Sequence, residues 1–357
     1  MKGFMLAFIV SILALTGYVC WHLWRIAPPG WKLAVVLLFL LWMASFFIGF
    51  AYIEEIPMKA ATLLYEIGNT WLIAFMYLLI VFFLADIASL CHLLPKTFLK
   101  DSMAGLLSVL GIVTLILVLG GIHYHHKYRE EMSLTTTKPL EKPLTIVMAS
   151  DLHLGYHNRK PELGRWIDMI NAEKPDLVLL GGDLVDRSLR PLLEGNYAEE
   201  FHRLNAPVLA VPGNHEYFTD FDGVERFYKD AGIQLLKDSV AHFKGLDIIG
   251  RNDRSYPGRA ALSDLAEGCT GFTIVLDHQP SHLEEAAGAG IDFQFSGHTH
   301  HGQVWPISWV TDLLYEQAWG HYRKEKTEYY VSSGLGLWGA KVRVGSRSEY
   351  LILYIRE

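Results

Sequence analysis

Charged residues are distributed very unevenly along this chain of 357 residues. Residues 1–123 contain only eleven charged side chains, six Lys or Arg and five Asp or Glu, and the other 58 lie in residues 124–357. A segment this poor in charge suits a lipid bilayer, where a helix satisfies its own backbone hydrogen bonds. We therefore expect membrane helices in the first third and an ordinary globular fold in the remainder.

Four apolar runs in the first third are long enough to span a hydrocarbon core of about 30 Å as helices. Trp and Tyr lie near several of their ends, as is typical of membrane–water interfaces. A water-soluble protein would rarely contain four consecutive core helices of this length. The runs cover residues 4–24, 31–53, 71–91 and 103–124.

The first run follows Lys2 and resembles a signal peptide, but it is longer than a usual apolar signal core and no A-x-A-like site follows it. A lipoprotein cleavage site at Cys20 is disfavoured because bulky Tyr18 and Val19 precede it. The three cysteines lie far apart, so they indicate neither a disulfide framework nor a cysteine metal site. We expect a retained helix.

Four spans would place the N-terminus and residues 124–357 on the same side of the membrane. Basic residues near the span ends divide equally between the two sides: Lys2, Lys59, Lys127 and Arg129 against Arg25, Lys32, Lys96 and Lys100. Lys138 and Lys142 then favour the cytoplasmic face for the globular part. We expect a multi-pass protein of the cell membrane.

The globular part carries 25 basic and 33 acidic residues, a net charge of −8. A nucleic-acid partner held by a broad basic face is therefore excluded. No sequence feature indicates a protein partner.

Residues 124–357 alternate between strand-like and helix-like segments. LTIVMAS (144–150) predicts a strand, and the following ELGRWIDMINAEKP repeats apolar residues at helical spacing. DLVLL, PVLAV, LDIIG, FTIVL and IDFQF are further strand-like runs, which predicts an α/β layered fold. We expect a transmembrane domain of four helices at 1–126, a polar linker at 127–143 and the α/β domain at 144–357.

Side chains of metal-binding types follow five of these strands. In open α/β sheets, ligands bind beyond the carboxyl ends of strands. Turn formation explains one Asp or Asn at such a place, but not five places with several histidines. On an extended segment, the histidines at 298 and 300 would point to the same side. The residues are Asp151, His153, Asp183, Asn214, His215, His278, His298 and His300.

Five sequence blocks carry these residues: SDLHLG, GGDLVDR, PGNHEY, LDHQP and SGHTHHGQ. They resemble the signature blocks of the calcineurin-like metallophosphoesterases, in the form D-x-H, G-D-x-x-D, G-N-H-E, H and G-H-x-H and in the family's order. The resemblance covers roughly residues 144–357 and is to membrane-associated bacterial members. It implies an enzyme that hydrolyses phosphoric esters, folded as a sandwich of two mixed β-sheets flanked by helices.

The resemblance also implies a site for two divalent metal ions. The ligands of one metal would be Asp151, His153 and His300. Those of the other would be Asn214, His278 and His298, with Asp183 bridging the pair. Imidazole combined with carboxylate or amide oxygen suits Mn, Fe, Zn or Co better than Ca or Mg, and we expect Mn. Two ions about 4 Å apart can share a hydroxide and neutralise charge in an in-line transition state.

Two further residues are expected to act in catalysis. The family places the histidine that matches His215 beside the leaving oxygen, so His215 would be the general acid. Asp186 would hydrogen-bond the other ring nitrogen and fix the tautomer, with a helix N-cap as its alternative role. Glu216 could support the site or only begin a helix, and it is not counted as catalytic.

The chain departs from its relatives at two positions. His301 replaces a glycine of the bacterial pattern G-H-T-H-G-G-Q, and we expect its side chain to point to solvent rather than to bind substrate. Arg187 matches a phosphate-contacting arginine of the protein phosphatases, but Ser188 replaces the glycine that follows it there, which leaves the role of Arg187 open.

The segment QVWPISWVTDLLYEQAW directly follows His300 and must therefore begin near the metals. It would either form an apolar wall beside the site or touch the bilayer. We therefore expect a membrane-borne substrate, with a lipid-linked phosphate as one form. The alternative function is a membrane sensor or transporter with a regulatory phosphoesterase-like domain that does not turn over. Asp86, in the third run, is expected at the interface rather than on an ion path, and the intact ligand set argues against loss of turnover.

Overall fold

The computed structural model describes residues 2–357, with side chains described from residue 10 onward. The chain forms two compact units. We call residues 1–121 the helical unit and residues 122–357 the α/β unit.

Long helices make up the helical unit. They are α1 (Lys2–Ile26), α2 (Lys32–Tyr52), α3 (Met58–Leu90) and α4 (Met103–His125), with the short 3₁₀ helix η1 (Lys96–Leu99) before α4. Three of them, α2, α3 and α4, are long and apolar enough to cross a membrane, and the described part of α1 adds a shorter apolar stretch, Val10–Ile26. The apolar helical region predicted from the sequence is thus present. Helix α3 has 33 residues, so the third predicted run is only its second half.

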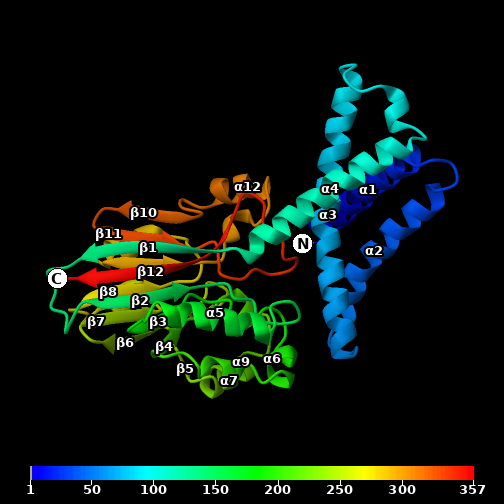
Figure 1. Ribbon diagram of the computed structural model, residues 1–357. Coiled ribbons are helices and arrows are strands. Elements are labelled where there is room, and N and C mark those ends of the chain that lie inside the picture. Colours follow the sequence, from blue (N-terminus) through cyan, green and yellow to red (C-terminus); the bar gives the residue numbers. More distant parts are fainter. Residues whose placement is uncertain (1) are drawn as a thin grey trace. The chain divides into compact units, whose positions relative to one another are not determined.

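Two six-stranded sheets form the α/β unit (Figure 1). The first has the order β1-β12-β2-β3-β4-β5 and the second β10-β11-β9-β8-β7-β6. Each sheet contains parallel and antiparallel pairs, as the predicted sandwich of two mixed sheets requires. The strands of the first sheet are β1 (Lys127–Thr135), β2 (Leu144–Ala149), β3 (Leu177–Leu180), β4 (Val208–Ala210), β5 (Ile233–Leu235) and β12 (Ser348–Arg356). Those of the second are β6 (Ser239–Phe243), β7 (Leu246–Gly250), β8 (Phe272–Leu276), β9 (Phe293–Ser296), β10 (Gly320–Lys324) and β11 (Thr327–Val331).

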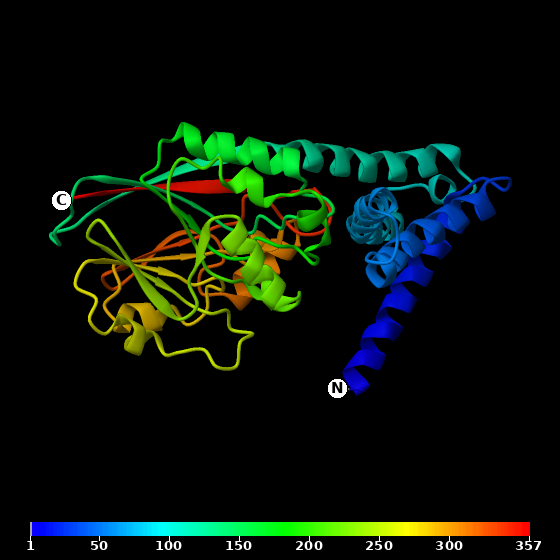
Figure 2. The same ribbon diagram turned by 90° about the horizontal axis from the view of Figure 1, so that it is seen from below.

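Alternate residues of β2 face opposite layers, because successive side chains of a strand point to opposite faces. Ile146 and Met148 pack between the two sheets, whereas Val147 and Ala149 pack toward the helices on the outer face of the first sheet. Figure 2 shows these layers from below. The helices are α5 (Lys160–Ala172), α6 (Arg190–Glu194), α7 (Ala198–Phe201), α8 (Asn214–Tyr217), α9 (Phe221–Asp230), α10 (Leu262–Ala266), α11 (Leu283–Gly288), η2 (His300–Gly302) and α12 (Ile307–Leu314).

The segment expected to be a polar linker, residues 127–143, begins with a strand instead. Strand β1 pairs in parallel with β12 over its whole length, from Lys127 beside Ser348 to Thr135 beside Arg356. It lies at the edge of the sheet, so its sequence stays polar while its backbone is paired. Only His126 separates α4 from β1, and residues 136–143 remain as the connection to β2.

Strands β2, β3 and β4 are parallel neighbours in the first sheet, as are β7, β8 and β9 in the second. The carboxyl ends within each set therefore lie at a common edge of their sheet. The loops that leave these ends carry the residues singled out in the sequence.

Candidate metal centre

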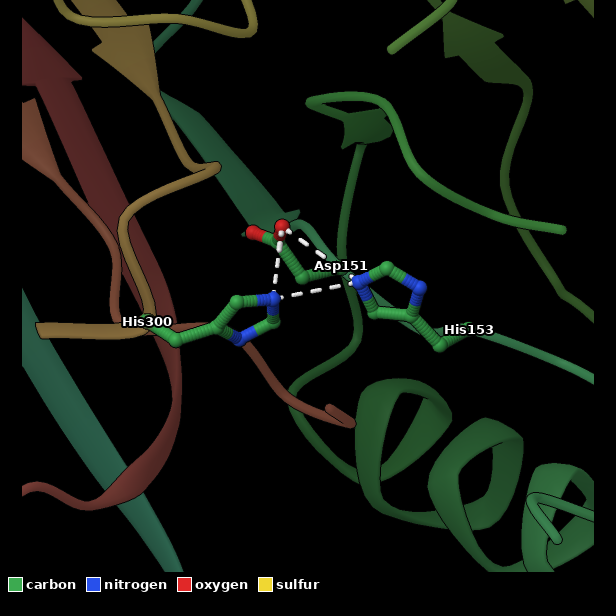
Figure 3. A group of neighbouring side chains, drawn as sticks. All are labelled: Asp151, His153 and His300. Carbon is green, nitrogen blue, oxygen red and sulfur yellow. Dashed lines mark hydrogen bonds and ion pairs between the residues drawn. The ribbon is translucent and has the colours of Figure 1, made fainter. Parts of the chain in front are cut away.

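Three predicted ligands form one compact group at the ends of β2 and β9 (Figure 3). The Nε2 atoms of His153 and His300 lie 3.1 Å apart, and Oδ1 of Asp151 lies 3.8 Å and 3.5 Å from them. Two ligands that each bind an ion at about 2.1 Å are separated by about 3.0–3.4 Å, so this triangle is close to the size that a metal needs. All three side chains are buried.

A second group follows β3, β8 and β9 and contains Asp183, His278 and His298. Nε2 of His278 lies 3.1 Å from Oδ2 of Asp183, and the rings of His278 and His298 are 5.2 Å apart. Nδ1 of His278 donates to the carbonyl oxygen of Gly181 at 2.8 Å. This hydrogen bond fixes the tautomer, so the lone pair on Nε2 faces the group.

The side chain of Asp183 lies between the two groups. Its Oδ2 atom is 3.7 Å from Nε2 of His153 in the first group as well as 3.1 Å from Nε2 of His278 in the second. Oδ1 of Asn214 is a buried acceptor with no hydrogen-bond partner among the described residues. Buried polar atoms are rarely left without a partner, and a metal ion would supply one. The donor set therefore fits two metal ions.

The backbone is strained where it presents these side chains. Five of the seven predicted ligands have φ between +43° and +70°, a region that residues other than glycine seldom adopt. They are Asp151, His153, Asp183, His298 and His300. Glycines allow the close approach of the loops, since a Cβ on Gly182 would lie 2.6 Å from the ring of His278 and one on Gly213 would clash with Asp183.

The expectation that His298 and His300 lie on an extended segment was wrong. Strand β9 ends at Ser296, and His300 begins the 3₁₀ helix η2. Both side chains still reach the centre, but they do so through left-handed backbone conformations, and each joins a different group.

Burial and charge set different protonation states within the centre. Burial lowers the pKa of His298 to about 4 and that of His300 to about 3, so both imidazoles are neutral at pH 7. Burial also opposes protonation of His153, but the carboxylates of Asp151 and Asp186 raise its pKa to about 10. Against the effect of burial, the charge of His278 holds the pKa of Asp183 well below its usual range. A divalent cation can take the place of such protons because it offers the carboxylates the same positive charge.

His215 lies at the edge of the centre, at the start of α8. Its ring is 4.6 Å from that of His153, centroid to centroid. Its Nδ1 atom lies 2.5 Å from the backbone carbonyl oxygen of Asp186 and 3.6 Å from the carboxylate of the same residue. We expected the carboxylate to make this hydrogen bond, but the main chain makes it. The carboxylate instead lies 3.3 Å from Nδ1 of His153.

Glu216 supports the centre, which is one of the two roles that the sequence left open for it. Its side chain is fully buried and accepts backbone N–H groups of Asp183, Val185 and Gly213 at 3.0, 2.9 and 2.7 Å. It thereby joins the loop after β3 to the loop after β4. The position of Glu216 directly after His215, in a tight turn, is the sequence feature that indicates this supporting role.

Arg343 is a second supporting residue that sequence reasoning missed. Its guanidinium is buried and donates to the carbonyl oxygens of His300, Ser333 and Gly336 at 3.2, 2.6 and 2.8 Å. The loop that carries His300 is therefore fixed to the loop after β11. Arg343 lies in no recognisable motif, so nothing in the sequence marked it.

His301 faces neither bulk solvent nor the metal ligands. Its ring stacks on Trp319 with the centroids 5.3 Å apart, and Nε2 lies 3.2 Å from Oδ1 of Asp312 on α12. Its side chain is only 19% exposed, contrary to the expected solvent position. Arg187 is half-buried beside Asp186.

Comparison with known proteins identifies the family of the α/β unit. Residues 144–302 match the family model described as calcineurin-like phosphoesterase. An uncharacterised metallophosphoesterase of Campylobacter jejuni is 31% identical over 256 residues, which cover 69% of this chain and 68% of the relative. One from Helicobacter pylori is 32% identical, with 61% of this chain and 60% of the relative covered.

A third relative carries membrane segments in its description. A transmembrane protein with a metallophosphoesterase domain from Danio rerio is 32% identical over 235 residues, which cover 60% of this chain and 53% of the relative. This pairing of membrane segments with a phosphoesterase domain matches the apolar helices that precede the sheets here. The chain therefore belongs to the calcineurin-like metallophosphoesterases, as a membrane-associated member.

Proposed function

We propose that this protein is a two-metal hydrolase of the cell membrane that cleaves a phosphomonoester, phosphodiester or pyrophosphate. The position of Asp183 is the observation that carries the proposal. One of its carboxylate oxygens faces His153 in the first donor group and His278 in the second, as a bridging ligand would. A site for a single structural metal ion would need only one of the two donor groups.

The proposed ligands follow the two groups. Asp151, His153 and His300 hold one ion, Asn214, His278 and His298 hold the other, and Asp183 bridges them. When bound, two divalent ions lower the pKa of a water molecule and polarise the phosphoryl oxygens. Mn is our first choice of metal, with Fe, Zn or Co also suited to these donors.

The leaving group needs a proton, and His215 is the residue that we propose to supply it. Its Nδ1 donates to the carbonyl oxygen of Asp186, so Nε2 is directed away from the main chain. A carboxylate oxygen of Asp186 lies 3.6 Å from the same Nδ1 atom.

We also propose that the substrate is membrane-borne, and helix α12 supports this. Four large apolar side chains on one side of this eight-residue helix are more than half exposed. They are Trp309, Val310, Leu313 and Leu314, with exposed fractions of 60, 52, 87 and 73%. Exposed apolar faces of this kind mark a binding surface, and an interfacial helix rich in Trp and Leu suits a bilayer.

Helix α12 also lies close to both the metal centre and the end of the membrane helix α4. The last turn of α4 belongs to the α/β unit, where Nε2 of His123 lies 3.0 Å from the carbonyl oxygen of Ser346. Oγ of Ser346 donates to the carbonyl oxygen of Gln303, just before α12. Helix α12 is thus linked, within the α/β unit, to the last turn of α4.

Hydrolysis by the full-length protein in detergent tests the reaction class. The protein is stripped of metal, reloaded with Mn and assayed with bis-p-nitrophenyl phosphate and p-nitrophenyl phosphate. We expect turnover that depends on metal and is lost in Asp183→Asn. A protein that binds two metals and hydrolyses neither these esters nor phospholipids would favour the alternative, a sensor or transporter with a regulatory domain.

The double variant Leu313→Ser/Leu314→Ser tests the membrane-borne substrate. We expect kcat/KM for a phospholipid in vesicles to fall about tenfold, with hydrolysis of bis-p-nitrophenyl phosphate unchanged. Leu193→Ser is the matched control because Leu193 is also exposed, at 61%, on α6. Equal effects on lipid and soluble esters would contradict the proposal.

The membrane topology is a further proposal. Four spans, with α1 as the first, would place the α/β unit on the same side as the N-terminus, and Lys138 and Lys142 favour the cytoplasm. We propose residues 1–126 as the membrane domain and 144–357 as the hydrolase core. Strand β1, from the segment expected to be a linker, adds an edge strand to the first sheet of that core. Protease protection of a tag after residue 357 in inverted and right-side-out vesicles distinguishes the two sides.

A further inference from the structure

A pocket lined by three arginines is formed by the loops that follow β7 and β8. Its volume is about 300 Å³, and Arg251, Arg254 and Arg259 line it together with Ser281 at its rim. The arginines come from the loop after β7, and Ser281 from the loop after β8. No predicted ligand or catalytic residue lines this pocket, so it is separate from the site described above.

Two of the arginines are held in place by ion pairs with the buried carboxylate of Asp277, and one of them also pairs with the exposed Glu285. Arg251 is only 5% exposed, and its Nη1 lies 3.2 Å from Asp277 and 2.7 Å from Glu285. Arg259 also pairs with Asp277. The Nε groups of both arginines are buried and have no hydrogen-bond partner among the described residues. The pocket thus holds rigid guanidinium groups with donors to spare.

The loops that form the pocket are connected to the chain that carries His278 of the second group. Asp277, which holds Arg251 and Arg259, directly precedes the ligand His278. The side chain of Gln279 donates to Asp253 at 2.9 Å, which ties the arginine loop to the chain just after His278.

Three arginines and one carboxylate, that of Glu285, line this pocket. Arg251 and Arg259 share the carboxylates of Asp277 and Glu285. Arg254 is exposed, and it forms no ion pair with any described residue. Guanidinium groups arranged in this way bind phosphate or carboxylate with charge-assisted hydrogen bonds. An anion bound in the pocket would accept such hydrogen bonds from the arginines.

We propose that the arginine pocket binds a second anionic group, a phosphate or a carboxylate, of the phosphoester whose scissile phosphate lies at the metal centre. This inference rests on the proposed function and narrows its substrate class to phosphoesters with two anionic groups. The same chemistry occurs in a phosphorylated lipid headgroup and in a free polyanionic phosphoester.

Binding of non-hydrolysable phosphonates tests the pocket without any need for turnover. Full-length protein loaded with Mn is titrated by calorimetry with alkyl monophosphonates and with alkane diphosphonates of increasing chain length. We expect the best-matched diphosphonate to bind about tenfold more tightly than the monophosphonate of the same length. Arg254→Gln and Arg259→Gln should each remove most of this advantage and leave monophosphonate affinity unchanged.

Arg203→Gln is the matched control, since Arg203 also pairs with two carboxylates, Asp168 and Glu200, but lies away from the pocket. Equal affinity of the wild-type protein for both phosphonates would overturn the proposal. So would a diphosphonate advantage that persists in Arg254→Gln, an exposed position where the substitution leaves the fold intact.

Two further measurements distinguish a lipid headgroup from a free phosphoester as the source of the anion. They also distinguish failure of the pocket proposal from failure of the proposed hydrolase function. A preference for phosphatidylglycerol phosphate over phosphatidylglycerol in vesicles that Arg254→Gln abolishes supports the pocket as a headgroup site. A preference confined to soluble diphosphonates supports it as a site for a free phosphoester. If the diphosphonate advantage is present but no ester is hydrolysed, the pocket stands and the proposed hydrolase function fails.

Discussion

Nε2 of His278 lies 3.1 Å from Oδ2 of Asp183, and the contact joins the two sheets of the sandwich. Asp183 follows β3 of the first sheet, and His278 follows β8 of the second. The candidate metal centre is therefore not carried by either sheet alone. Its geometry depends on the packing of the inner core, where side chains such as Leu179 and Ile274 hold the sheets together.

Asp183→Asn should lose at least one of the two metal ions, because an amide cannot supply negative charge to both donor groups. Loss of residues that only support a metal ligand typically costs about 10–100-fold in affinity or activity, so the loss here should exceed about 100-fold. Metal content by mass spectrometry and turnover of bis-p-nitrophenyl phosphate check this. Asp168→Asn, at a side chain 63% exposed, is the control. Full metal content with full activity would refute the bridging role.

His215→Asn should keep both metals and slow the reaction by about 10²–10⁴-fold, as expected for loss of a general acid. The loss should be largest for alkyl leaving groups and small for p-nitrophenol, which needs little protonation. Rates for a series of aryl and alkyl esters measure this dependence. His242→Asn, at a side chain 74% exposed on β6, should leave all rates unchanged. An equal loss for every leaving group would argue for a binding role.

Glu216→Gln should destabilise the α/β unit by about 2–4 kcal/mol, since it replaces a buried carboxylate that accepts three backbone N–H groups. The amide group would place its own N–H atoms against these donors. Metal content should fall as well, because the loop with Asp183 loses its anchor. Thermal unfolding checks the first effect, with Glu194→Gln on exposed α6 as control. Unchanged stability would show that the loops are held by other contacts.

Glu162 should make the stability of the α/β unit depend on pH. Burial opposes its ionisation, but Lys341, with Nζ at 2.5 Å, and the hydroxyl of Tyr124 hold its pKa below the usual 4.5. The carboxylate therefore stabilises the folded state above about pH 4.5, and this contribution is lost as pH falls through the lower folded-state pKa.

The free energy of unfolding of the wild type should accordingly exceed that of Glu162→Gln by about 1–3 kcal/mol at pH 7. This difference should become smaller as the pH is lowered. Urea unfolding at several pH values measures it. The exposed Glu199→Gln should show no such trend. A difference that is constant with pH would mean that Glu162 acts through packing and not through its charge.

The strands that carry ligands could be predicted because buried parallel strands have continuous apolar sequences. LTIVMAS and FTIVL became β2 and β8, and the residues that follow them lie together in space. The types of the candidate ligands could also be recognised from the sequence, since Asp and His seldom follow several strands of one protein by chance. The identity and the order of the candidate ligands could therefore be predicted from the sequence.

Three features could not be predicted, for different physical reasons. Strand β1 is an edge strand with a polar sequence, so it lacks the apolar signal of a central strand. The left-handed backbone at His298 and His300 is imposed by the surrounding loops and not by local preference. The support of the His300 loop by Arg343 spans 43 residues, and no local pattern reports a contact at that distance.

The strand order also constrains how the protein can be made. Strand β12 lies between β1 and β2, although β1 and β2 come first in the chain and β12 follows every other strand. During synthesis, strand β1 therefore cannot pair with its neighbour β12 until residues 348–356 have left the ribosome. The helices can enter the bilayer well before this happens. The first sheet therefore reaches its full strand order only after β12, the last strand in chain order, has been synthesised.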